Sequence, residues 1–322
     1  MVKRPSLSGW PGALVLLVFL AAAPSFLPVY WVLLGTEILI MGLFAMSFNL
    51  LFGYTGLLSF GQAGLLGVGA YTAALLMTHG VTSLWLVLLA SVGAAAVTAL
   101  LVGFLCVRRD EIFFAMLSLA LGMMLFTVAH NWREVTGGSD GLPVFSVPPV
   151  VLGPWKVSLF APASAYYFVL FWAVAGALFL WAVVRSPFGL VLKAVRENKE
   201  RLSFSGANVK AVRLAAFVTA GALAGLAGFL LCLFNRMATP DMLHWSFSAR
   251  PVLMTILGGA GTFLGPAVGA AIFFVLEHWV TTFTENWMIV LGAILIPVVL
   301  FFPEGIWGTL LHAFRSRRRS TP

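Results

Sequence analysis

Residues 83–107 have the sequence SLWLVLLASVGAAAVTALLVGFLCV, a stretch without a single charged side chain. About 20 apolar residues in a helix cross the hydrocarbon core of a bilayer, so this stretch is long enough to span it. Similar runs recur along the 322-residue chain, of which 61% is hydrophobic and only 9% is charged. The runs are Gly12–Tyr30, Trp31–Phe52, Leu57–Thr78, Ser83–Val107, Ile112–Trp132, Ala163–Val184, Leu214–Asn235 and Trp287–Phe302. Continuous runs of this length fit helices rather than the alternating strands of a membrane barrel. The sequence therefore predicts an all-α polytopic membrane protein with about eight spanning helices.

The basic residues are concentrated in four places: residues 3–4, 108–109, 185–213 and the tail at 312–322. Cytoplasmic loops of membrane proteins carry an excess of Lys and Arg. We therefore expect these four groups on the cytoplasmic side, together with both termini. Residues 1–322 then form one transmembrane domain with a basic cytoplasmic tail. On this interpretation the formal net charge of +8 reflects membrane topology and not a nucleic-acid partner.

The stretch ARPVLMTILGGAGTFLGPAVGAAIFFVLEHW (Ala249–Trp279) is long enough to cross a membrane once, but its composition favours a turn. In a helix interior, Gly costs about 1 kcal/mol and Pro about 3 kcal/mol relative to Ala. Both residue types gather between Gly258 and Pro266. A single crossing would also leave the basic tail on the outer side. We therefore expect two short helices that meet at a glycine turn, so that the chain returns to the side it left.

Two glycine-interrupted segments, Gly53–Ala74 and Leu257–Phe274, resemble each other. The small residues that match after one gap are Gly56, Gly61 and Ala63 in the first segment and Gly261, Gly265 and Ala267 in the second. Paired segments of this kind in the two halves of a transporter point to its translocation pathway. Gly and Ala also permit close helix packing, and the two interpretations are compatible. The helix-breaking or gating glycines expected from this repeat are Gly56, Gly61, Gly258, Gly259, Gly261 and Gly265.

Four polar residues accompany the first segment: Asn49, Ser59, Gln62 and Tyr71. Polar side chains within membrane segments face a bundle interior or a water-filled cavity, so these four are candidates for lining a pathway. Hydrogen bonding between helices explains them equally well. The histidines show no metal-ligand spacing, and no metal site is predicted.

A dense mixed-charge patch, RENKERLSFSGANVKAVRLAAF, occupies residues 196–217. A short helix is expected just before and within it, because Ser186 suits an N-cap, Pro187 the first helical position and Gly206 a left-handed C-cap. Its apolar stripe consists of Phe188, Val191, Leu192, Val195 and Leu202. Anionic lipid attracts positive charge alone, whereas a mixed-charge face with an apolar stripe suits a groove on another protein.

Five motifs in order resemble the permease subunits of branched-chain amino acid ABC importers, most closely the LivM type. The motifs are AMSFNLLFGYTGLLSFGQAGLLGVGAYTAALL (45–76), TGGSDGL (136–142), RSPFGLVLKAVRENKERLSFSGANVKAVRLAAFVTAGALAGLAG (185–228), LGGAGTFLGPAVGAA (257–271) and LFFPEGIWG (300–308). The resemblance runs from about Phe44 to Gly308. It implies the ABC importer permease fold with an internal pseudo-repeat.

The resemblance also implies roles and partners. Residues 186–213 are then a cytoplasmic coupling-helix loop that docks into a cleft of an ATPase subunit. The residues that match the core of that loop are Glu197, Asn198, Arg201 and Gly206, although LSFS before the glycine departs from the alanine-rich sequence frequent in the family. The implied partners are a second permease of the LivH type, two cytoplasmic ABC ATPase subunits and a periplasmic solute-binding protein, in the bacterial inner membrane.

The TGGSDGL motif is expected in a loop on the outer face. Gly138, Ser139 and Asp140 then help to receive the binding protein, although Asp140 followed by Gly141 is equally a simple turn.

No phosphate-cradling GxxxxGK[ST] loop occurs in the chain, so ATP and magnesium are expected on the partner ATPases and no cofactor on this chain. No HExxH motif and no pair of mid-membrane Asp residues is seen, which disfavours an intramembrane enzyme. A secondary transporter remains an alternative, but ion coupling usually requires mid-span carboxylates, and none is seen. Leucine, isoleucine and valine are the substrates that the family implies, with urea, short amides or other amino acids as alternatives.

Overall fold

A computed structural model describes residues 18, 20–108, 111–152, 155–283 and 305–309, together with 289–290, 292–293, 296–297 and 300. The helices are α2 (Val29–Thr55), α3 (Gln62–Thr78), α4 (Leu84–Cys106), α5 (Glu111–Asn131), α6 (Arg133–Thr136), α7 (Pro162–Arg185), α8 (Pro187–Glu197), α9 (Lys199–Phe204), α10 (Val209–Asn235), α11 (Trp245–Gly258) and α12 (Gly265–Thr281), with the 3-10 turns η2 (Gly138–Asp140) and η3 (Pro240–Leu243). The strands are β1 (Leu142–Pro143), β2 (Val150–Leu152), β3 (Trp155–Val157) and β4 (Met237–Ala238).

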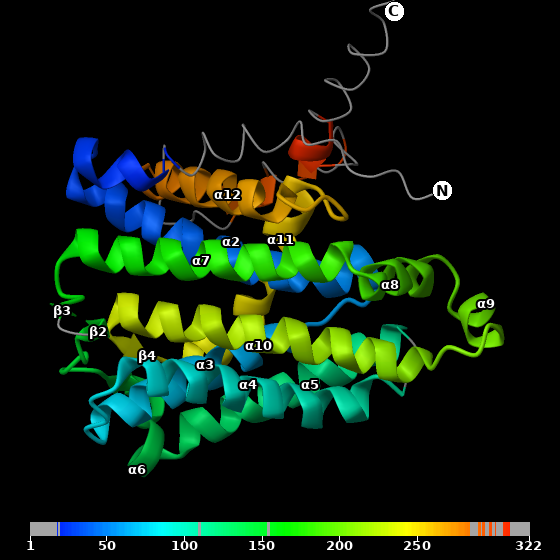
Figure 1. Cartoon of the computed structure of the whole chain (residues 1–322), viewed down its shortest axis with the longest axis horizontal. Helices are drawn as coiled ribbons and strands as arrows, with labels where there is room; N and C mark the ends of the chain where they lie inside the picture. The colour runs from blue at the N-terminus through cyan, green and yellow to red at the C-terminus, as the bar shows by residue number, and fades with distance from the viewer. Residues whose placement is uncertain are drawn as a thin grey trace, which may run out of the picture.

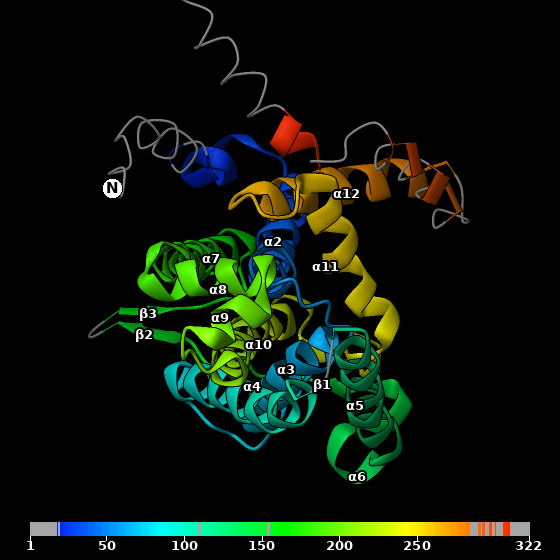
Figure 2. The same ribbon diagram turned by 90° about the vertical axis from the view of Figure 1, so that its right-hand side faces the viewer.

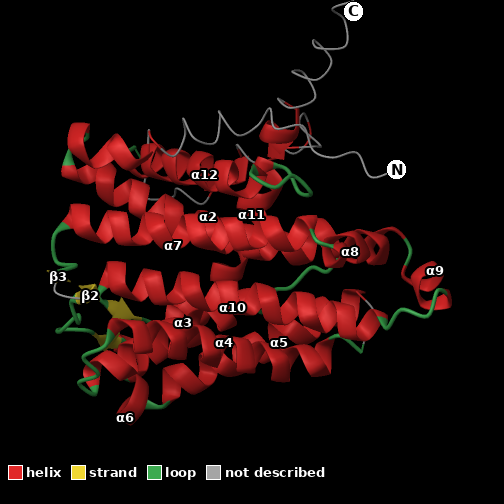
Figure 3. Ribbon diagram, in the orientation of Figure 1, coloured by secondary structure: helices red, strands yellow, loops and turns green. Residues whose placement is uncertain are grey.

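The fold is all-α, as predicted, and its few strands lie in connections (Figure 3). Within the described residues, five helices are long and apolar enough to cross a membrane: α2, α4, α5, α7 and α10. Of the predicted run Gly12–Tyr30, residues 18 and 20–30 are described, and residues 20–26 are helical. The predicted run Trp287–Phe302 falls largely outside the described residues. The boundary expected between the first two runs, after Tyr30, is wrong by two residues, because α2 already begins at Val29 after Pro28.

The run predicted at Leu57–Thr78 is only partly helical. Its first five residues are irregular, and α3 begins at Gln62. Gly56 ends α2 in a left-handed conformation with φ of 78°, which a residue with a side chain rarely adopts. At about 1.5 Å per residue, the 17-residue α3 is shorter than the hydrocarbon core of a bilayer.

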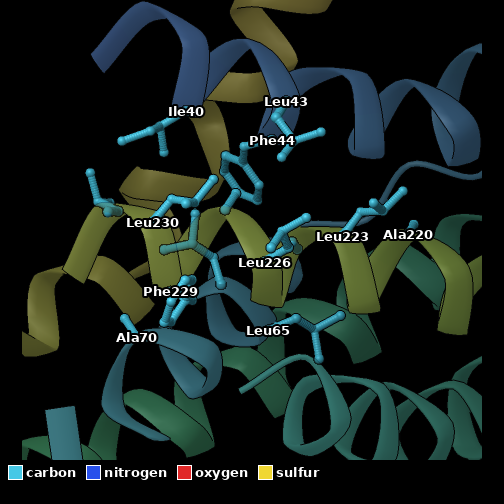
Figure 4. Packing of buried hydrophobic residues seen from close by; sticks show 14 of the residues in the cluster. Ile40, Leu43, Phe44, Leu65, Ala70, Ala220, Leu223, Leu226, Phe229 and Leu230 are labelled. Carbon is cyan, nitrogen blue, oxygen red and sulfur yellow. The ribbon is translucent and has the colours of Figure 1, made fainter. Parts of the chain in front are cut away.

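The long helices lie roughly parallel, and the connections gather at two ends (Figure 1). One end carries α6, η2 and the four strands and is called the strand end. The other carries α8 and α9 and is called the α9 end. Seen from the α9 end, α2 and α10 lie in the middle of the bundle, with α7 on one side and α3, α4 and α11 around them (Figure 2). The core forms where α2, α3 and α10 meet, around Phe44, Leu65, Phe229 and Leu230 (Figure 4).

Helices α3 and α10 touch through their backbones. A Cβ atom on Gly228 of α10 would overlap the carbonyl oxygen of Leu66 in α3, and one on Gly69 would overlap the backbone of Gly225. Small residues at such a contact let two helices approach more closely than larger side chains allow. The glycines at this contact therefore serve packing, which is one of the two interpretations offered above for the first glycine-interrupted segment, to which Gly69 belongs.

The predicted glycine turn in residues 249–279 is confirmed. Helices α11 and α12 pack against each other and are joined through residues 259–264. Helix α11 follows η3 at the strand end, and α12 returns there, where the hydroxyl group of Tyr30 is hydrogen-bonded to the imidazole of His278. Helix α11 begins earlier than expected, at Trp245, because His244 caps it by accepting a hydrogen bond from the amide of Ser246.

At the strand end, connections from three parts of the chain are tied together. Strand β1 pairs with β4, and the amide of Val144 donates a hydrogen bond to the carbonyl oxygen of Arg236, 2.8 Å away. Arg236 adopts a left-handed conformation at the end of α10, and its guanidinium donates to the carbonyl oxygen of Phe160 at 3.3 Å. The hairpin β2–β3 is held to α4 by a hydrogen bond from the Trp85 indole to Val151.

Candidate functional site

The two glycine-interrupted segments meet at the α9 end of the bundle. The first break, residues 56–61, joins α2 to α3, and the second break, residues 259–264, joins α11 to α12. A Cβ atom on Gly53, one turn before the first break, would lie 2.8 Å from the backbone nitrogen of Gly261. Gly261 has a φ of 87°, so it supplies a left-handed turn where α11 reverses into α12. The segments that resemble each other in sequence are thus also neighbours in space.

Asn49 of α2 holds the second break through both ends of its amide. Its Nδ2 donates a hydrogen bond to the carbonyl oxygen of Thr262 at 2.9 Å, and its Oδ1 accepts one from the amide of Gly261 at 3.3 Å. The side chain is 2% exposed, so these bonds replace water for a buried polar group. The two hydrogen bonds of Asn49 therefore fix the position of the second break relative to α2.

Arg196 connects the charged segment to both breaks. Its guanidinium donates a hydrogen bond to the carbonyl oxygen of Gly53. The aliphatic part of the side chain passes Gly56, where a Cβ atom would lie 3.3 Å from it, and its Nη1 would lie 3.4 Å from a Cβ atom on Gly261. Sequence reasoning did not single out Arg196, because nothing local distinguishes it from the other basic residues of the patch.

Helix α8, which carries Arg196, begins and is anchored as the sequence predicts. Ser186 caps it by accepting a hydrogen bond from the amide of Gly189, and Pro187 is its first residue. Leu192 and Val195 are buried on its inner side. The ammonium group of Lys193 lies 5.6 Å from the centre of the Tyr54 ring in α2.

The expectation of a single helix up to Gly206 is wrong. The helix stops at Asn198, whose backbone is extended and whose side chain caps α9 by accepting a hydrogen bond from the amide of Arg201 at 2.8 Å. Gly206 has a φ of 86° after α9, as expected of a left-handed cap. Asn198 therefore separates α8 from α9 and caps the start of α9.

The four residues predicted to contact an ATPase, Glu197, Asn198, Arg201 and Gly206, are all exposed. The structure gathers them at the corner formed by α8, α9 and the turn after α9, beyond the ends of the long helices (Figure 1). The sequence did not single out Phe204, which is 89% exposed at the end of α9. A phenyl ring so fully exposed among charged residues is typical of an anchor residue in a protein interface.

The four candidate pathway residues do not gather in one cavity. Asn49 is at the second break, where it also borders a small cavity between α2 and α7. Ser59 is in the first break, while Gln62 and Tyr71 are in α3, and all three are buried. Gln62 donates a hydrogen bond to the carbonyl oxygen of Ala220 at 3.3 Å, which fits helix–helix bonding. For the Ser59 and Tyr71 hydroxyl groups, the described residues supply no hydrogen-bond partner.

Two serines outside the repeat support the first break. The hydroxyl of Ser118 in α5 accepts a hydrogen bond from the amide of Phe60 at 3.2 Å. The hydroxyl of Ser248 in α11 accepts one from the amide of Ala63 at 2.9 Å, at the start of α3. The beginning of α3 lacks a side-chain cap of its own, so these hydroxyl groups satisfy backbone donors that would otherwise be orphaned.

Charged side chains also meet within the apolar helices, in the half nearer the strand end. Arg250 of α11 lies 3.7 Å from the carboxylate of Glu277 in α12. Glu37 of α2 is within electrostatic range of both. The ion pair joins α11 to α12, and Glu37 adds a second carboxylate within α2. The apolar helices therefore do contain carboxylates, contrary to the expectation from the sequence.

The residues expected on the outer face lie at the strand end, opposite the charged segment. Gly138, Ser139 and Asp140 form η2, where the hydroxyl of Ser139 donates a hydrogen bond to the carboxylate of Asp140 at 3.2 Å. Both side chains are exposed. The glycines on either side have positive φ values, so the motif forms a compact turn.

The chain is similar in sequence to known membrane permeases. A family model described as the branched-chain amino acid transport system permease component matches residues 31–299. The high-affinity branched-chain amino acid transport system permease protein LivM of Escherichia coli (strain K12) is 25% identical over 310 residues, covering 90% of this chain and 73% of the relative. LivH of the same strain is 27% identical over 285 residues, covering 83% of this chain and 90% of the relative. The guanosine ABC transporter permease protein NupQ of Bacillus subtilis (strain 168) is 27% identical over 232 residues, covering 68% and 72%. No solved structure matches.

Proposed function

Because the chain belongs to the branched-chain amino acid transport permease family, we propose that it is the membrane-spanning subunit of an ABC importer that carries leucine, isoleucine and valine inward. One observation supports the proposal above others. The exposed charged segment α8–α9 is connected through Arg196 to both glycine breaks. A segment built in this way suits the transmission of force from a partner outside the membrane to the helices within it.

The α9 end is the cytoplasmic side in this proposal, and the strand end faces outward. The basic residues of α8, α9 and the first turns of α10 then follow the positive-inside rule. Both chain termini are assigned to the cytoplasm, and the membrane is the bacterial inner membrane.

Two ABC ATPase subunits hydrolyse ATP with magnesium, and this chain binds no cofactor and catalyses no reaction. One ATPase receives the corner formed by α8 and α9, with Phe204 as an apolar anchor and Glu197 and Arg201 as charged partners. A second permease of the LivH type completes the membrane pore. A solute-binding protein delivers the substrate at the strand end, near Asp140.

Movement of α8 is transmitted in two steps. The guanidinium of Arg196 pulls on the carbonyl oxygen of Gly53, at the end of α2. The amide of Asn49 then passes the displacement to the second break, because it bonds both Gly261 and Thr262. Glycine turns with few side chains deform at low cost, so the two breaks move together while the helices around them stay packed.

The substrate is proposed from the relatives named for branched-chain amino acids. A relative named for guanosine supplies the competing substrate class. The test is uptake of labelled leucine into proteoliposomes that hold this chain, the second permease and the ATPases, with and without ATP and the binding protein. Urea, ribose and guanosine serve as competitors.

We expect uptake that needs both ATP and the binding protein and that resists all three competitors. Inhibition by guanosine, with ATP dependence retained, would replace the substrate and keep the transport mechanism. Uptake without ATP would contradict the importer proposal and favour a facilitator.

A further inference from the structure

A cavity of about 240 Å³ lies at the α9 end, apart from the two breaks. The residues that line it are Val107, Arg108, Lys199, Glu200, Ser203, Val209, Lys210 and Arg213. They come from the end of α4, from α9 and from the first turns of α10, three segments that converge at this end of the bundle (Figure 2). The cavity is large enough for a small ionic group with a few water molecules.

The lining is strongly cationic. Arg108, Lys199, Lys210 and Arg213 face one carboxylate, that of Glu200, which gives a formal charge of four minus one, or +3. In sequence, Arg108 is followed by one more cation and two carboxylates at residues 109–111. Counting these as well gives five cations and three carboxylates, so the net charge falls from +3 to +2 and is still positive.

The position of two cations favours an anion at the level of lipid headgroups. Arg213 is only 5% exposed, so bulk salt screens its charge less than that of a surface residue. Arg108 is stacked on Phe104 of α4 at 4.1 Å, and Phe104 is 51% exposed on the outside of the bundle. An exposed ring near the end of an apolar helix contacts lipid, which sets Arg108 at the membrane surface.

We propose that this cavity binds a phosphate-bearing anion, supplied either by the headgroup of an anionic phospholipid or by free phosphate. Cationic pockets between the cytoplasmic ends of membrane helices are suited to such headgroups. The bound anion bridges α9 to the ends of α4 and α10, since each supplies cations to it. It thereby steadies the charged segment, whatever solute the chain carries.

The chain offers a matched control for Arg108. The guanidinium of Arg185, at the end of α7, lies 4.2 Å from the centre of the Trp181 ring, four residues earlier in the chain. Arg108 makes the same kind of contact with Phe104, also four residues earlier. Arg185 does not line the cavity. A comparison of these two arginines separates the cavity from general attraction between basic residues and a membrane.

The test uses the purified full chain in detergent and native mass spectrometry during titration with phosphatidylglycerol. Phosphatidylcholine with the same acyl chains is the reference lipid. The double variant Arg108→Gln with Lys210→Gln removes two exposed cations and should weaken phosphatidylglycerol binding about 30-fold, from the typical attraction of each basic residue to anionic lipid. Arg185→Gln should weaken it much less than the double variant does, because Arg185 does not line the cavity. Glu200→Gln should strengthen it, because it removes a repelling carboxylate.

A second arm measures the Tm of the same proteins with inorganic phosphate against chloride at equal ionic strength. A phosphate-specific rise in Tm that the double variant loses supports a free anion, and a loss confined to phosphatidylglycerol supports a headgroup. The proposal is overturned if the double variant binds both anions like the parent, or if Arg185→Gln loses as much as the double variant.

Discussion

Asn49 donates a hydrogen bond from its side-chain amide to the carbonyl oxygen of Thr262, 2.9 Å away, although 213 residues separate them in the chain. This bond and its partner from Gly261 fix the second break against α2. Replacing Asn49 with Ala should lower the free energy of unfolding by about 1–3 kcal/mol, because the buried side chain loses both of its hydrogen bonds to the second break. The fall should appear as a lower Tm in detergent.

The control for that change is Asn131→Ala. The Asn131 amide is exposed and bonds only Thr127 of its own helix. Its loss should leave the Tm unchanged. An equal fall in both variants would mean that the second break does not depend on Asn49.

Arg196 should be needed for coupling more than for folding. Arg196→Met keeps the length of the side chain but removes the donor to Gly53. A hydrogen bond from a charged group contributes about 1.5–3 kcal/mol, so we expect uptake to fall about tenfold or more while ATP hydrolysis continues. Arg185→Met, measured in the same proteoliposomes, should transport normally. Normal uptake by Arg196→Met would remove this contact from the proposed transmission path.

Phe204 should contribute to ATPase binding without contributing to the fold. Its ring is 89% exposed, so Phe204→Ala should leave the Tm of the isolated chain unchanged. Anchor residues in interfaces typically contribute about 2 kcal/mol or more, which predicts about 30-fold weaker association with the ATPases. Ser205→Ala, at the next position, is the control. Unchanged association in both variants would place the interface elsewhere.

The charges of the segment should act by pairing with a partner. The swap of Glu197→Arg with Arg201→Glu keeps the net charge of the patch, so attraction to anionic lipid is preserved. We expect normal insertion, but ATP hydrolysis that no longer drives uptake, because complementary charges across an interface now repel. The measurement is the ratio of leucine transported to ATP hydrolysed. A normal ratio would contradict pairing with a partner protein and would favour an interaction of the patch with anionic lipid.

Two glycines in apolar helices should respond oppositely to a methyl group. Gly228→Ala places a Cβ atom against the carbonyl oxygen of Leu66 and should destabilise the chain by about 1–3 kcal/mol. Gly93→Ala in α4 meets no atom within 4 Å and should be neutral or stabilising by up to about 1 kcal/mol. Tm values in detergent separate the two, and equal values would refute backbone contact between α3 and α10.

Features that depend on neighbouring residues could be predicted from the sequence. The apolar runs predicted the long helices. The glycines and proline between Gly258 and Pro266 predicted the turn between α11 and α12, and Ser186 predicted the start of α8. Each depends on properties of a few adjacent residues, such as hydrophobicity, missing donors or capping oxygens. The capping action of Asn198 was missed because the glutamates, lysines and arginines around it are good helix formers, which favoured a continuous helix.

Features that depend on long-range contacts could not be predicted. The hydroxyl groups of Ser118 and Ser248 bond the first break from two other helices, and no local pattern separates them from serines that bond their own helix. The same holds for Arg196, one basic residue among several. Of the candidate pathway residues, only Asn49 reaches the second break, because helix rotation and register decide what a polar side chain meets.

The contacts of Arg236 hold one end of α10 in a different way from the other. Its left-handed backbone, its bond from Val144 and its contact with Phe160 fasten the end of α10 to both neighbouring connections. The opposite end of α10 emerges from the exposed turn at Gly206, where a side chain would meet no atom within 4 Å. Helix α10 is therefore held by hydrogen bonds at the strand end and by packing of buried side chains such as Phe217 at the α9 end. The two ends should respond to different changes: loss of a hydrogen bond at one, and loss of apolar contact at the other.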